Sequence, residues 1–365
     1  MVPFVHIFTD ANVSGYRACC AASKDRREKT DVTPMAWWHS DDMNEFRQEQ
    51  LSGDIPTECE KCYIAESRTG HSFRTASNAR YEKLTSPQPL PSNWQITMGN
   101  ICNIGCWTCS ETYSSVIETH KRKINILPEN YVSPNKKFRD TWQDLQSQIM
   151  NSYELHDVVS INIVGGEPLH TKETEDFLKS LIEKGLSTRT ALEIHTNAVK
   201  LPDKYQELLD KKLWKHIYIF ISIDAVGVKA EWLRYGSDWN KIDSNIDKIK
   251  TLASYTECHA VVSVLNINDL PALQEYCDSK QLKLQCILVT NPAFMSLAEW
   301  PGDPDMLCDK QQLVDAGFEV FYNTLGSKAK QQSVKLLRDH ITQFDGVRTP
   351  LVEFDKKLAE LLTIT

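Results

Sequence analysis

The sequence has no long apolar run, since no stretch approaches the roughly 18–20 apolar residues that a membrane-spanning helix needs. The N-terminal residues Met-Val-Pro-Phe-Val-His also lack the basic region and apolar stretch of a secretory signal. Positive charge is in deficit, because 41 Lys and Arg stand against 49 Asp and Glu, a formal net charge of −8. These absences predict a cytoplasmic protein with no membrane partner, and they argue against broad electrostatic binding of nucleic acid.

The composition suits a large folded core. Of the 365 residues, 41% are hydrophobic and 25% are charged, and no repeat or low-complexity tract interrupts them. At about 150 residues per domain, this length suggests two or three structural units.

The chain holds 11 cysteines, which is many for a compartment where disulfides are uncommon. Four are scattered, and scattered thiols are usually small buried hydrophobes. The other seven fall before residue 110, and grouped thiols suggest metal ligands. These seven are Cys19, Cys20, Cys59, Cys62, Cys102, Cys106 and Cys109.

Apolar segments of strand type alternate with amphipathic ones after a Pro-rich connector at residues 86–92. Six strands alternating with helices predict parallel strands in a barrel or an open sheet. The expected strands are 94–98, 158–164, 192–195, 217–223, 260–265 and 284–289. The expected helices are 138–150, 171–184, 205–209, one capped by Asp238, 270–276, one capped by Ser327, and 351–362.

A loop with three cysteines follows the first of these strands. In Asn100-Ile-Cys102-Asn-Ile-Gly-Cys106-Trp-Thr-Cys109, the thiols are spaced to surround one cubane iron–sulfur cluster. A closed structural cluster takes four protein thiolates, so three would leave one iron open to bind a substrate or cofactor. Trp107 offers an aromatic surface beside such a cluster. The alternative is a zinc site with a further ligand from elsewhere.

This wording, Asn-x-Cys-Asn-x-x-Cys-x-x-Cys, resembles the radical S-adenosylmethionine (SAM) superfamily, although Thr108 stands where its aromatic residue is usual. Val164-Gly165-Gly166-Glu167-Pro168 ends the second strand and is similar to the motif that holds the SAM amino group in that family. The alternative is an ordinary strand-to-helix turn. By itself, glycine allows close backbone approach and a carboxylate accepts hydrogen bonds from an ammonium group.

Further resemblances follow the third and fourth strands. Thr196-Asn197-Ala198 is similar to a Thr-Asn-Gly turn of the family, with Ala198 in place of glycine. Ser222 and Asp224 end the fourth strand, and Arg234 follows; in relatives such residues contact the SAM ribose and carboxylate, although Asp224 could also be structural. These positions end successive parallel strands, where barrel enzymes place their active sites.

The resemblance implies an α/β fold, a partial TIM-like (β/α)6 barrel over residues 91–300. A helical C-terminal extension would cover residues 301–365. Residues 1–90 would form a small cysteine-rich metal-binding domain, similar to the auxiliary-cluster module called twitch or SPASM. Its candidate ligands are Cys19, Cys20, Cys59 and Cys62, with an iron–sulfur cluster, zinc or no metal as the alternatives.

The implied activity is that of a radical SAM enzyme. A [4Fe–4S] cluster on Cys102, Cys106 and Cys109 would cleave SAM reductively to a 5′-deoxyadenosyl radical, which takes a hydrogen from the substrate. The implied partners are SAM, a peptide, protein or small-molecule substrate, and a one-electron donor such as a flavodoxin or ferredoxin. A nucleotide or nucleoside is the alternative substrate, and a non-catalytic, metal-stabilised binding protein is the alternative class.

Overall fold

The computed structural model describes residues 6–9, 16–19, 32–70, 72, 74–75, 78 and 89–363. The chain divides into two compact units. The first unit consists of Met1–Ile101, Val132–Ile194 and Glu207–Tyr218, and the second of Cys102–Tyr131, His195–Gln206 and Ile219–Thr365. Cys20 and residues 86–88 of the predicted connector lie outside the described residues.

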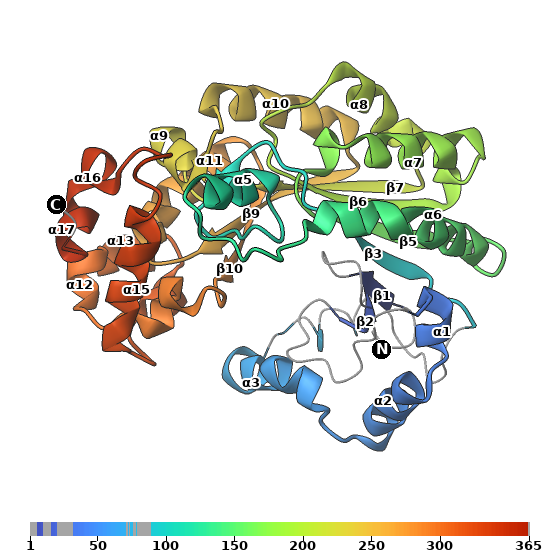
Figure 1. Ribbon diagram of the computed structural model, residues 1–365, viewed down its shortest axis with the longest axis horizontal. Helices are drawn as coiled ribbons and strands as arrows, with labels where there is room; N and C mark the ends of the chain where they lie inside the picture. The colour runs from blue at the N-terminus through green and yellow to red at the C-terminus, as the bar shows by residue number, and fades with distance from the viewer. Residues whose placement is uncertain are drawn as a thin grey trace. The chain divides into compact units, whose positions relative to one another are not determined.

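Strands and helices alternate over most of the chain (Figure 1). The strands are β1 His6–Thr9, β2 Tyr16–Arg17, β3 Asn93–Thr97, β4 Gly105–Cys106, β5 Val159–Val164, β6 Thr190–Thr196, β7 His216–Ser222, β8 Arg234–Tyr235, β9 Tyr255–Val262 and β10 Lys283–Leu288. The helices of the first half are α1 Pro34–Trp38, α2 Asp41–Ser52, α3 Glu60–Thr69, α5 Ser115–Lys123, α6 Pro134–Ser152, α7 Lys172–Glu183 and α8 Asp203–Leu208. The helices that follow are α9 Gly227–Leu233, α10 Trp239–Leu252, α11 Leu270–Ser279, α12 Pro304–Leu307, α13 Lys310–Asp315, α14 Glu319–Tyr322, α15 Gln331–Thr342, α16 Leu351–Phe354 and α17 Lys356–Leu361.

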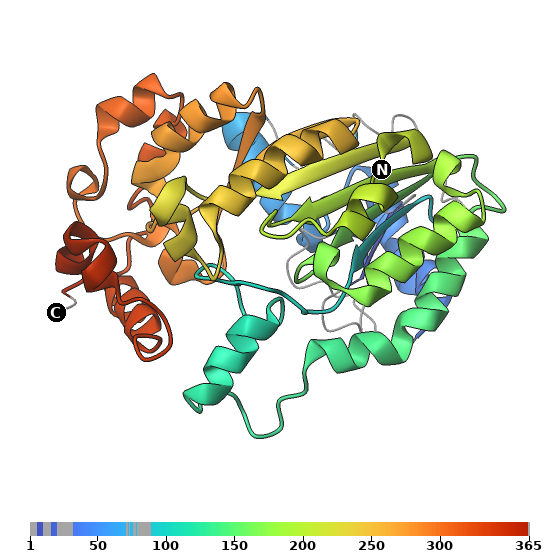
Figure 2. The ribbon, with the colours of Figure 1, turned by 90° about the horizontal axis from the view of Figure 1, so that it is seen from above.

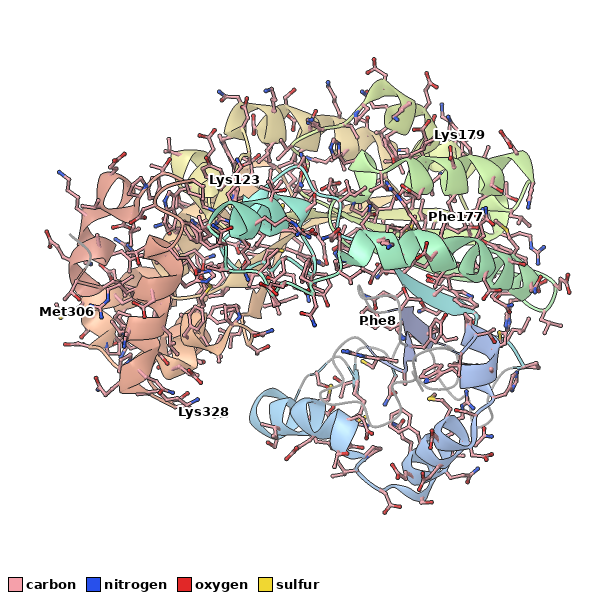
Figure 3. All side chains as sticks on the ribbon, in the orientation of Figure 1. Phe8, Lys123, Phe177, Lys179, Met306 and Lys328 are labelled. Carbon is pink, nitrogen blue, oxygen red and sulfur yellow. The ribbon has the colours of Figure 1, made fainter. Side chains whose placement is uncertain are left out.

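The first unit contains a mainly parallel sheet. Strand β3 pairs in parallel with β5, and β5 pairs in parallel with β6, so that Trp94 lies beside Ile161 and Ile161 beside Leu192. These three side chains are fully buried. Helices α6 and α7 belong to the same unit, and the rings of Trp142 and Phe177 meet edge to face at 5.3 Å. Figure 3 labels Phe177, which is fully buried, and Lys179, which is exposed on the same helix.

Strand β1 is a difference from the sequence-based expectation. It pairs in parallel with β3, and the Thr97 side chain and backbone both hydrogen-bond to Thr9, at 2.7 and 3.0 Å. The segment before the boundary that we predicted at residue 90 therefore supplies a strand to this sheet. The short sequence His6–Thr9 is too brief for its apolar pattern to be recognised as a strand.

The second unit is built around one hydrophobic core. Strands β9 and β10 pair in parallel, and α10 begins at Asp238, whose side chain accepts a hydrogen bond from the Lys241 backbone as predicted. The core joins Trp232 and Leu265 to Leu337 and Leu358 of the C-terminal helices. The predicted extension at residues 301–365 therefore shares its core with the segment before it. Figure 2 shows helices α15 to α17 grouped at the C-terminal end of the chain.

The prediction of an α/β fold with mostly parallel strands is confirmed. Two details of the C-terminal prediction are wrong. Lys330, rather than Ser327, precedes the helix α15, and the single helix expected at 351–362 is broken at Asp355, whose side chain caps α17 instead. In the part of the chain that the structure describes, no helix is long and apolar enough to cross a membrane.

Replacing Ile246 by Ala should lower the free energy of unfolding by about 2–4 kcal/mol, because this α10 side chain is fully buried. Lys248 on the same helix is exposed, and Lys248→Ala should change the value by less than about 0.5 kcal/mol. Urea unfolding followed by circular dichroism measures both. Equal losses in the two variants would contradict the assigned burial of this helix face.

Candidate active site

The cysteine loop lies directly after β3 and before α5. The backbone N–H of Cys102 donates to the Ser115 hydroxyl at 3.1 Å, and that hydroxyl donates back to the Cys102 carbonyl at 3.3 Å. Ser114 caps α5 and donates to the Ile104 carbonyl at 2.9 Å. The loop is therefore tied at two places to the first turn of the helix that follows it.

A short antiparallel pairing brings Arg234 to the middle cysteine. Strands β4 and β8 pair with Cys106 opposite Arg234, and the next backbone N–H, of Trp107, donates to the Leu233 carbonyl at 3.0 Å. The guanidinium nitrogen Nη1 of Arg234 lies 3.8 Å from the Cys106 sulfur. The sequence placed these residues 128 positions apart, and the pairing of two-residue strands carried no pattern that could reveal it.

Asp224 holds Arg234 in place. Its carboxylate lies 2.9 Å from the Arg234 Nε and also accepts the backbone N–H of Val261 at 2.8 Å. Both side chains of the pair are buried. Although burial opposes it, the charges of Asp224 and Cys106 raise the pKa of Arg234, so that it stays cationic. Asp224 thus has the structural role that the sequence left open, while any contact with a ligand remains a prediction.

The thiols of the loop lie close enough to interact. Burial raises the pKa of the Cys109 thiol, and Cys106 and Cys102 raise it further. Burial also raises the pKa of the Cys106 thiol, which Arg234 and Arg348 oppose. Three thiols that would be anions as ligands are therefore gathered beside two cations. Such a set suits an iron–sulfur cluster, whose thiolates bind separate irons.

In the described residues, no three or more His, Cys, Asp or Glu side chains form a group that could hold a single metal ion.

Trp107 differs from the open aromatic surface that we expected. Its side chain is 2% exposed, with Trp232 at 5.2 Å and Phe344 at 5.8 Å between ring centroids. The guanidinium of Arg348 lies over the ring at 4.4 Å. The residue therefore joins the core of the second unit, and its ring is covered by protein side chains.

The segment Gly165-Gly166-Glu167-Pro168 packs against the backbone that leads into the cysteine loop. Gly166 donates to the Gly99 carbonyl at 3.2 Å, and Glu167 donates to the Ile101 carbonyl at 2.8 Å. A Cβ atom on Gly166 would collide with the Ile101 carbonyl, and Gly165 has a φ of +128°. The lack of a side chain on these glycines therefore permits the close approach of this segment to the backbone of Gly99 and Ile101.

Glu167 is buried and its side chain accepts the backbone N–H of Leu169 at 3.1 Å. It therefore caps the short helical turn Pro168–His170, which is the role expected of an ordinary turn residue. This cap is compatible with a second role for the carboxylate, since each carboxylate has two oxygens with several acceptor positions.

Asn197 contacts the cysteine loop within the second unit. Its side-chain amide donates to the Asn103 side-chain oxygen at 2.8 Å, and its own oxygen accepts the Val199 backbone N–H at 3.0 Å. Thr196 accepts the Ala198 backbone N–H at 3.1 Å. Ala198 has a φ of +56°, a backbone conformation that glycine adopts more easily than residues with a side chain. The family's glycine at this position fits that conformation. Ser222 ends β7 and is partly buried.

The N-terminal cysteines Cys19 and Cys62 both act on the thiol of Cys59. Burial raises the pKa of the Cys59 thiol to about 12, and the Cys19 and Cys62 thiols raise it further. Gln50 donates to the Cys59 sulfur at 3.4 Å. Cys19 and Cys62 thus influence the Cys59 thiol electrostatically, while the predicted fourth candidate, Cys20, lies outside the described residues.

Sequence reasoning missed Arg348 and Asn103. Asn103 lies in the cysteine loop and contacts Asn197. The only signal for this contact in the sequence is that both residues follow predicted strands. Arg348 lies in the C-terminal segment, and no motif marks it.

The family model described as "Radical SAM superfamily" matches residues 96–274 of this chain. This range contains the cysteine loop, the Gly-Gly-Glu-Pro segment and Arg234. A search among curated proteins gave no match.

Several solved structures are similar at low identity. One described as native anSMEcpe with bound AdoMet is 19% identical with a TM-score of 0.45, over 69% of this chain and 66% of that one. Another, SuiB of Streptococcus suis bound to S-adenosylmethionine, is 15% identical with a TM-score of 0.40, over 78% and 60%. TYW1 with a lysine-pyruvate adduct is 13% identical with a TM-score of 0.36, over 64% and 74%. The alignments thus span less than two thirds of the first two structures' own chains.

Replacing Gly166 by Ala should destabilise the protein by about 2 kcal/mol or more, because the added methyl group meets the Ile101 backbone carbonyl, which has little room to move. Gly346 offers a matched control, since it has no positive φ and no atom within 4 Å of the place where its Cβ would lie. Urea unfolding measures both variants. A Gly166→Ala protein as stable as Gly346→Ala would contradict the close approach described above.

Proposed function

This chain belongs to the radical SAM superfamily, and from that membership we propose that it is an enzyme whose [4Fe–4S] cluster is held by Cys102, Cys106 and Cys109. The observation that carries the proposal is the loop itself. Its thiols are gathered together and faced by the cations Arg234 and Arg348. A set of buried cations beside three thiols supports an anionic group as the occupant, because a buried cation needs a counter-charge.

When bound, the cluster would supply one electron to the sulfonium of SAM, and the resulting 5′-deoxyadenosyl radical would remove a hydrogen atom from the substrate. The three cysteines would hold three irons and leave the fourth for SAM. Ser114 and Ser115 would keep the loop backbone in its shape through the hydrogen bonds to Ile104 and Cys102.

SAM would be oriented by the residues that end the strands. We propose that Gly165, Gly166, Glu167 and Pro168 receive its amino group, with Glu167 as acceptor. Thr196 and Asn197 would shape the neighbouring turn, in which Asn197 is already tied to Asn103 of the loop. Ser222, Asp224 and Arg234 would complete the set, the last two as a fixed ion pair beside Cys106. Trp107 would support the cysteine loop by packing in the hydrophobic core, because its ring is too buried to stack on a ligand.

A second, auxiliary iron–sulfur cluster is proposed at Cys19, Cys59 and Cys62, with Cys20 as a further candidate ligand. The support is the mutual influence of the three described thiols on the pKa of Cys59. The segment resembles a twitch or SPASM module in its cysteines, although it precedes the barrel in this chain.

For the substrate we propose a peptide or protein, and for the reductant a one-electron donor such as a flavodoxin or ferredoxin.

Replacing Cys102, Cys106 and Cys109 by Ala should abolish SAM cleavage, because the cluster would lose its ligands. Protein reconstituted without air should contain iron and sulfide, give a reduced-cluster EPR signal that SAM perturbs, and release 5′-deoxyadenosine with dithionite. Cys308, buried near α12, is the control, and Cys308→Ala should keep this activity. Release of 5′-deoxyadenosine at the normal rate by the triple variant would refute the assignment.

Replacing Cys59 and Cys62 together by Ala should remove only part of the iron, because the loop at 102–109 keeps its own cluster. Iron and sulfide analysis per chain, beside the EPR spectrum of the remaining cluster, measures this. If the double variant keeps its full iron content, the auxiliary cluster is absent or lies elsewhere.

A further inference from the structure

Arg348 reaches the cysteine loop from the C-terminal segment. It is 5% exposed, and its guanidinium carbon lies 4.4 Å from the ring centroids of both Trp107 and Phe344. Its Nη2 is 3.2 Å from the place where a side chain on Gly105 would begin. The absence of a side chain at Gly105 therefore allows the guanidinium to lie against the loop, one residue before Cys106.

The backbone around Arg348 is anchored. Its N–H donates to the Phe344 carbonyl at 2.9 Å, and the indole N–H of Trp232 donates to the Thr349 carbonyl at 3.2 Å. The side chain is thus held between two rings by a fixed segment, and its approach to the loop is part of the fold rather than one rotamer of an exposed arginine.

The charge of Arg348 has no carboxylate partner in the described residues. Its Nε donates to the His120 ring at 3.3 Å, and burial lowers the pKa of that imidazole to about 4, so His120 is neutral at pH 7. The nitrogens Nη1 and Nη2 are buried and make no hydrogen bond to any described atom. Burying two donors and a positive charge without partners lowers the stability of the folded protein. An anion bound beside the guanidinium would remove that cost.

Arg234 supplies the contrast. It also lies near Cys106, but its charge is balanced by Asp224 at 2.9 Å. At Cys106 the charge of Asp224 opposes that of Arg234, whereas no carboxylate among the described residues pairs with Arg348. Burial lowers the pKa of Arg348 to about 10, an effect that Cys106, Tyr235 and Cys109 oppose, so the guanidinium is cationic at pH 7.

We propose that Arg348 is a positioning residue that acts on the cluster through its buried positive charge and raises its reduction potential. The inference rests on the proposed function, since it requires the cluster on Cys102, Cys106 and Cys109. Reduction adds one negative charge to the cluster, and a desolvated cation beside it favours the reduced state.

The test is the midpoint potential of the loop cluster, measured by EPR-monitored redox titration without SAM on the full-length protein. The titration uses protein that also carries Cys59→Ala and Cys62→Ala, so that the proposed auxiliary cluster contributes no EPR signal. Arg348→Met, which can fill the space between the two rings, should lower the reduction equilibrium constant about tenfold, which is about 59 mV for a one-electron couple. Arg348→Lys keeps the charge and should restore the constant to within about threefold of the parent.

Two further variants separate charge from packing. Lys335→Gln removes an exposed charge from α15 and should leave the potential unchanged. Gly105→Ala keeps Arg348 but places a methyl group 3.1 Å from Val116 Cγ1, 3.2 Å from Arg348 Nη2 and 3.3 Å from Ile117 Cδ1. It should shift the guanidinium and lower the potential by less than Arg348→Met does. This variant also serves if Arg348→Met does not fold, which thermal melting reveals.

The outcomes distinguish the two proposals. A parent protein that takes up no iron at the loop refutes the proposed function. A parent that loads normally, with Arg348→Met and Gly105→Ala at the same potential as the parent, refutes the role of Arg348 alone. A shift in Arg348→Met that Arg348→Lys fails to reduce would also overturn it, because a loss of packing would then be the cause.

Discussion

The pairing of Cys106 with Arg234 across two very short strands is the contact on which the candidate site depends. It fixes the middle cysteine of the loop opposite a cation, and Asp224 fixes that cation in turn. Buried charges are stable only where each has a partner, so the aspartate, the arginine and the thiol constrain one another. Any occupant of the loop must fit into this arrangement, in which one arginine is already neutralised.

Close backbone approach is the second constraint. Gly166 has no space for a Cβ because the Ile101 carbonyl lies against it, and Ile101 is bonded to the first cysteine of the loop. Thus the glycine after β5 packs directly on the backbone of Asn100 and Ile101. The same principle explains Gly105, which leaves space for Arg348. At both positions a neighbouring group occupies the space that a side chain would need: the Ile101 carbonyl at Gly166, and the Arg348 guanidinium among others at Gly105.

The sequence was sufficient for features with a local pattern. The alternation of apolar and amphipathic segments predicted the parallel strands, and Asp238 predicted the start of α10. The cysteine spacing predicted a cluster site in the loop, and that assignment stays a prediction. Contacts between distant and very short segments had no such pattern: β1 has four residues, and β4 and β8 have two each. Trp107 was misjudged because a residue's exposure depends on what packs over it, here Phe344 from far along the chain.

The C-terminal helices show why the family match does not describe the whole site. That match ends at residue 274, whereas Phe344 and Arg348 lie well beyond it. Phe344 shares one hydrophobic core with Trp107 and Trp232, and the guanidinium of Arg348 lies over the rings of Trp107 and Phe344, so this segment packs directly on Trp107 of the cysteine loop. A desolvated charge has a larger effect than the same charge in water, so a single arginine in such a covering segment can change the electrostatics of the loop.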